Sequence, residues 1–185
     1  MKTSMPAQTP HPAPSADHQP ALRQITLWAA QYVARALPIF ESQVPGDSRP
    51  RDAITASQTF AYGAARDKAL RTAAWDAHKA AAQAEPASAK HAARAAMLTA
   101  AIAYTHTDLT TGTQGISQAQ HLLGPIVYAA LAIGAADDLF AEAAQTAPPE
   151  LINLLQQFPP QPGGRTTLKR LYQELDTALR NRPTP

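Results

Sequence analysis

Apolar side chains recur at helical spacing along most of this chain, in alanine-rich segments bounded by proline or glycine. The clearest stripe follows Pro20 and comprises Leu22, Ile25, Trp28, Ala29, Tyr32, Val33, Ala36 and Phe40. Positions three and four residues apart share one face of an α-helix, and alanine has the best intrinsic helix propensity. No segment shows the pattern of a strand or hairpin. We therefore expect an all-α fold, a single-domain Ala-rich helical bundle of about six to eight helices.

Proline and glycine set the expected boundaries of the helices. Pro38 should kink or end the first helix, and Gly124-Pro125 should bend or split the fifth. In the third helix we expect one apolar face, which consists of Leu70, Ala74, Trp75, His78 and Ala81 or Ala82. The helices are expected over residues 21–40, 50–62, 64–85, 89–106, 117–136, 137–146, 148–158 and 166–181.

The composition also divides the chain into three parts. Residues 1–20 hold five prolines among small and polar residues, and cannot build a core, so we expect a disordered Pro-rich tail. Residues 21–160 form the helical bundle domain, and residues 161–185 form a linker and a C-terminal helix.

Charge and cysteine content exclude several classes of function. The net charge is only +2, and Lys and Arg are spread along the chain, so we expect no nucleic-acid partner. The absence of Cys excludes disulfides and thiolate chemistry and fits a cytoplasmic location. The longest apolar runs are too short to cross a membrane, and the N-terminus lacks the apolar stretch of a secretory signal. We therefore expect no membrane association.

The histidines offer the main candidate for a ligand site. His78, His106 and His121 lie on three separate predicted helices, which could bring them together around a metal ion or a small ligand. No two of them have the three- or four-residue spacing of a helical metal site. We favour a structural role for them and expect neither a metal nor another cofactor.

Other constellations that could support catalysis are incomplete. No serine has the glycine context of an activated nucleophile, and Asp137-Asp138 point to different sides of a helix. The loop over residues 107–115 lacks the lysine and the preceding strand of a phosphate-binding loop. We therefore expect a protein that is not an enzyme.

The turn between the first two helices is the candidate for partner binding. The segment from Pro45 to Asp52 is charged and contains the turn-forming residues proline and glycine. Its Arg49, Arg51 and Asp52 could recognise charged groups on another protein. The same residues could instead form a solvated turn with local Arg–Asp pairs, which is the reading we favour from the residues alone.

Several segments together resemble a known family. The strongest similarity lies over residues 27–54, in Leu27–Ala30, Ala34–Glu41 and Pro45–Ile54. Weaker similarities are Ala77–Ala81, His121–Gly124, Tyr128–Ala132 and Leu151–Pro160. These segments resemble the group-five-like immunity protein family of bacterial polymorphic toxin systems, over roughly residues 24–160. The helix after residue 165 is then an extension.

The resemblance implies a non-enzymatic antidote that binds and neutralises a partner toxin. Two alternatives stay open from the residues. One is a helical bundle that binds a metal or small ligand through its histidines. The other is a self-associating structural protein, a homodimer formed through Ala-rich faces and the Leu-rich C-terminal helices.

Overall fold

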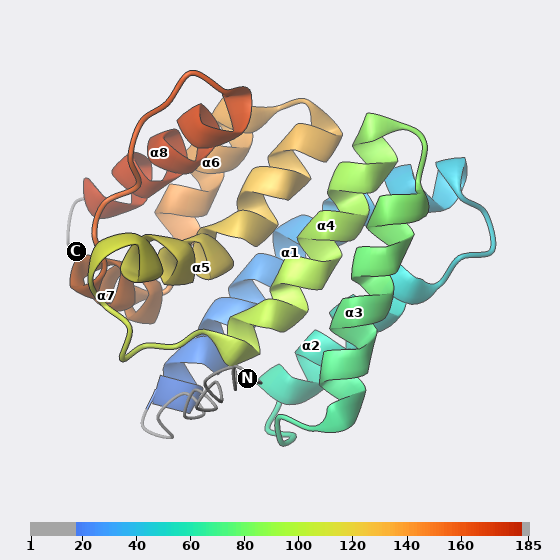
Figure 1. Cartoon of the computed structure of the whole chain (residues 1–185), viewed down its shortest axis with the longest axis horizontal. Helices are drawn as coiled ribbons and strands as arrows, with labels where there is room; N and C mark the ends of the chain where they lie inside the picture. The colour runs from blue at the N-terminus through green and yellow to red at the C-terminus, as the bar shows by residue number, and fades with distance from the viewer. Residues whose placement is uncertain (1–17, 183–185) are drawn as a thin grey trace, which may run out of the picture.

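The computed structural model describes residues 18–182, and these fold into eight α-helices and one 3-10 turn without a strand (Figure 1). This confirms the all-α bundle predicted from the sequence. Most of the tail predicted over residues 1–20 lies outside the described residues. The helices are α1 (Gln19–Gln43), α2 (Arg49–Ala61), α3 (Lys68–Gln83), α4 (Ala87–Ala101), α5 (Gly112–Ile133), α6 (Ala136–Thr146), α7 (Pro149–Gln157) and α8 (Thr167–Arg180), and the turn η2 (Ile102–Tyr104) follows α4.

Helix α4 lies at the centre of the bundle, where it packs against α1, α2, α3 and α5. Its buried face is made almost entirely of alanine, which lets the surrounding helix backbones approach closely. Larger side chains from the neighbouring helices fill the remaining space and supply most of the buried apolar surface. The fully buried ones include Leu22, Ile25 and Phe40 of α1 and Leu122, Leu123 and Ile126 of α5.

Prolines lie inside two long helices without ending them. Pro38 lies within α1, which continues to Gln43, so the prediction that it could end the helix is wrong. Pro125 lies within α5, which runs unbroken to Ile133, so of the two alternatives predicted there, a bend or a split, the split is wrong. Each proline removes one backbone hydrogen bond. Burial of the flanking apolar face offsets that loss, so packing and not local helix preference keeps each helix continuous.

Helix α5 begins within the segment that the sequence assigned to a loop. It starts at Gly112, which has a positive φ of 57°. With 22 residues, α5 is long and apolar enough to cross a membrane, contrary to the sequence prediction. However, 67% of its apolar window is buried inside the protein, as expected of the core helix of a bundle.

The C-terminal linker and α8 pack onto the rest of the bundle. Helix α8 contacts α5, α6 and α7. Its Asp176 is only 2% exposed and accepts hydrogen bonds from Arg180 Nε and from the backbone N–H of Gln161, both at 2.8 Å. The side chain of Gln161 in turn donates to the carbonyl oxygen of Ile116 on α5 at 3.0 Å. These contacts join the linker to α5 and α8.

Candidate partner-binding surface

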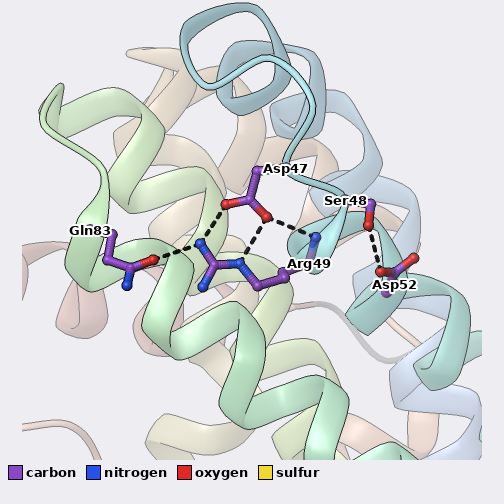
Figure 2. A network of polar contacts seen from close by, with 5 residues as sticks. All are labelled: Asp47, Ser48, Arg49, Asp52 and Gln83. Atoms are coloured by element: carbon purple, nitrogen blue, oxygen red, sulfur yellow. Dashed lines mark hydrogen bonds and ion pairs between the residues drawn. The ribbon is translucent and has the colours of Figure 1, made fainter.

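The turn between α1 and α2 is held by one arginine and one aspartate (Figure 2). The Asp47 carboxylate accepts hydrogen bonds from Arg49 Nε at 2.8 Å, from Arg49 Nη2 at 2.6 Å and from the Arg49 backbone N–H at 3.1 Å. Arg49 Nη2 also donates to the side-chain oxygen of Gln83, the last residue of α3, at 2.7 Å. The network therefore ties the turn to the C-terminal end of α3.

This pair is partly shielded from solvent. The side chains of Arg49 and Asp47 are 32% and 15% exposed. The Arg49 side-chain hydrogen bonds lower the pKa of Asp47, and Asp47 raises the pKa of Arg49. The structure gives Arg49 an internal role, to position the turn and α3. A direct contact between Arg49 and a partner stays a prediction.

Arg51 and Asp52 lie on the exposed side of α2. Arg51 forms a two-pronged ion pair with Glu41 of α1, with both N–O distances at 2.7 Å, and its side chain is 58% exposed. The hydrogen bonds to Glu41 raise the pKa of Arg51. Asp52 accepts a hydrogen bond from the hydroxyl group of Ser48 at 2.8 Å. Both charged groups can therefore be reached from solvent.

A groove of about 530 Å³ runs between α2 and α3. Ala69 and Ala73 give it an apolar floor, and charged side chains of both signs stand around it. The full lining comprises Arg49, Asp52, Lys68, Ala69, Thr72, Ala73 and Asp76. The groove thus includes two of the three residues that the sequence proposed for partner binding.

The exposed face of α3 differs from the sequence prediction. Trp75 is 59% exposed and His78 is exposed, whereas Leu70 and Ala81 are buried, so the expectation that these residues share one apolar face is wrong. Their rings meet edge to face, with centroids 5.6 Å apart. The buried face consists of Leu70, Ala77, Ala80 and Ala81. Helix α3 packs closely against α2 and α4, and small alanines fit that contact where a tryptophan would not.

The structure brings two of the three candidate histidines near each other. His121 of α5 is largely buried, and its pKa is lowered, first by burial and second by the nearby His106. The His106 ring lies 3.7 Å from the Asp108 carboxylate. His78 does not join them, because it lies on the exposed face of α3. Among residues 18–182, no group of three or more His, Cys, Asp or Glu side chains could hold a metal ion.

The fold and this surface define a small all-α protein with an apolar, charge-rimmed groove beside an exposed tryptophan. The chain belongs to the family described as Imm-5 like putative immunity protein, which matches residues 18–157. This match extends from the start of α1 to the end of α7 and confirms the resemblance found in the sequence. No curated protein sequence and no solved protein structure matches the chain.

Proposed function

We propose that this chain is an immunity protein that binds a toxin protein in the bacterial cytoplasm and neutralises it by covering its active surface, without catalysing a reaction. The observation that carries this proposal is the family match over seven of the helices. An immunity protein requires a protein partner, because neutralisation depends on contact with the toxin.

The surface of the protein supports a binding role. Protein interfaces typically combine an apolar centre with a polar rim, and the groove between α2 and α3 has this composition. Asp52 lines this groove and Arg51 is exposed on the same helix, and we include both among the contacts with the toxin.

Co-expression tests this proposal directly. The full-length chain is produced in a bacterial host together with toxin domains from the polymorphic toxins of its own genome, beginning with the gene adjacent to its own. We expect one of these domains to stop growth alone and to become harmless when the chain is present. Failure of the well-folded chain to restore growth against any of them would refute the proposal.

Ligand binding through histidines is the second candidate. The observation in its favour is that His121 has a buried Nδ1 without a hydrogen-bond partner and lies near His106. In this proposal His78 would have to reach the other two by a rearrangement of α3. Elemental analysis of the purified chain tests the metal version, which requires at least one bound metal ion that is lost in His121→Gln.

A further inference from the structure

We propose that the exposed face of α3 is the main docking surface for the toxin, and that it takes an acidic protein surface with an apolar pocket for Trp75. This inference rests on the proposed function and goes further, because it names the helix, the anchor residue and the chemistry of the partner. We call this face the α3 stripe. It consists of Lys68, Arg71, Trp75, His78 and Lys79.

The exposure of Trp75 is the first argument. Trp75 and Tyr62 are the exposed large hydrophobic side chains of the described chain. The other tryptophan, Trp28, is 5% exposed, and its indole N–H donates to Thr146. Tryptophan is among the residues most enriched at interface positions that contribute most to binding. The edge-to-face contact with His78 restricts the ring before binding, so less conformational entropy is lost in a complex.

The charge of the α3 stripe is the second argument. Lys68, Arg71, His78 and Lys79 precede or follow Trp75 by seven, four, three and four residues, so all lie on its side of the helix. All four side chains are exposed, and no acidic residue belongs to the stripe. An acidic partner surface complements this pattern, and such complementarity accelerates association and excludes wrong partners.

The groove beside the α3 stripe is the third argument. Lys68 belongs to the stripe and also lines the groove, so the two features are continuous. The groove floor adds apolar surface next to Trp75, which gives the interface an apolar centre and a charged rim. Arg49 acts as a positioning residue, because its bonds to Asp47 and Gln83 hold α3 against the turn between α1 and α2.

The same stripe is less suited to nucleic acid. Nucleic-acid binding depends on neutralising many phosphates with a large excess of positive charge, whereas the net charge of the chain is +2. Membership in an immunity protein family also favours a protein partner.

Affinity measurements on matched variants test the inference. The probe is the toxin domain against which the wild-type chain restores growth, in a catalytically inactive form. Trp75→Ala should weaken binding about 30-fold or more, and Lys68→Glu about tenfold with a smaller salt dependence. The controls are Tyr62→Ala, a more exposed aromatic at the end of α2, and Lys169→Glu on the exposed side of α8. Both controls should bind as the wild type does.

The controls separate the α3 stripe from other exposed groups. Helices α3 and α8 lie on opposite sides of the bundle (Figure 1), and α8 is outside the family match. All four substitutions change exposed side chains, so the variants should keep the melting temperature of the wild type. If Trp75→Ala and Lys68→Glu both bind and protect normally, the α3 stripe is not the docking surface, while the proposed function stands.

Fluorine NMR places the contact on one residue. The chain is labelled with 5-fluorotryptophan, which gives one resonance each for Trp28 and Trp75, assigned with Trp75→Phe. Addition of the unlabelled toxin domain should shift the Trp75 resonance and leave that of Trp28 unchanged. A complex that forms without moving the Trp75 resonance overturns the inference.

Two further results would also overturn it. A Trp75 resonance that shifts with the concentration of the chain alone would assign the α3 stripe to a second copy of the chain. Trp75-dependent binding of a single-stranded oligonucleotide of about 20 residues at physiological salt would assign it to nucleic acid. If the wild-type chain protects against no toxin, the inference falls together with the proposed function.

Discussion

The ion pair between Arg49 and Asp47 yields a prediction of how burial changes the contribution of an ion pair to stability when the geometry stays similar. Arg49→Ala and Arg51→Ala each remove a two-pronged contact to a carboxylate with similar distances. The two sites differ in exposure, since the Arg49 side chain is 32% exposed and that of Arg51 is 58% exposed. Arg49 also has a third side-chain acceptor in Gln83, whereas Arg51 has only Glu41. We therefore expect Arg49→Ala to destabilise the protein much more than Arg51→Ala.

The expected loss for Arg49→Ala follows from the contacts that it removes. Removing a charged hydrogen-bond partner from a largely buried carboxylate costs about 1.5–3 kcal/mol, and the bond to Gln83 contributes about 1 kcal/mol. The partial exposure of Arg49 lowers the first figure toward that of surface pairs. The sum is a loss of about 2 kcal/mol in the free energy of unfolding, or a shift of about 1 M in the urea midpoint.

The same pair predicts a pH dependence with a definite sign. The folded-state pKa of Asp47 lies below its ordinary value of 3.8, mainly because of Arg49. The ionised carboxylate thus stabilises the folded state above pH 3.8, and this contribution is lost as the pH falls through the lowered pKa. The stability gap between the wild type and Arg49→Ala should be complete near neutral pH and should narrow below about pH 4.

Urea unfolding followed by circular dichroism measures both effects on the two variants at neutral and acidic pH. Equal midpoints for Arg49→Ala and Arg51→Ala would show that burial does not distinguish the two pairs. A gap that stays constant down to about pH 2 would show that the ionisation of Asp47 does not couple to folding through Arg49.

Three other predictions address the core and the C-terminal helix. Asp176→Ala removes the carboxylate partner of the Arg180 guanidinium, whose side chain is only 19% exposed, and should cost about 3 kcal/mol in urea unfolding. A loss below about 1 kcal/mol would contradict the role of this contact. The lowered pKa of His121 makes the folded state bind protons less readily than the unfolded state, so the wild type should lose stability as the pH falls below about 6.5. This loss should be smaller in His121→Gln. A wild-type melting temperature that does not fall with pH would refute the prediction. Gly124→Ala should lower the free energy of unfolding by about 1–3 kcal/mol, although alanine has the better helix propensity, because the new Cβ would lie 2.7 Å from Leu98 Cδ1. If this contact is the cause, adding Leu98→Ala to the same chain should recover part of the loss.

The sequence predicts the number and order of the helices because each has its own apolar periodicity and is bounded by proline or glycine. It does not decide whether Pro38 and Pro125 end their helices, since the cost of one missing backbone bond is local while the burial that offsets it comes from the whole bundle. The buried contact between Asp176 and the Gln161 backbone leaves no sequence signal, because its partners lie 15 residues apart and one of them is the main chain.

The third helix shows why part of the surface could not be predicted. Alanines occupy both sides of α3, so two faces satisfy the helical period almost equally well. Summed hydrophobicity favours burial of the face with Trp75, whereas close packing against α2 and α4 favours burial of the face with small side chains. The sequence did contain the signal for the correct face, namely the basic residues at three, four and seven positions from Trp75.

Titration of toxin activity with the purified chain tests the central claim most directly, because binding and catalysis differ in stoichiometry. If the chain neutralises by covering the toxin, activity should fall linearly and reach its minimum at one equivalent, with no further change over time. Complete inactivation by a small fraction of an equivalent, progressing with time, would contradict the account and would show that the chain acts as an enzyme on its partner.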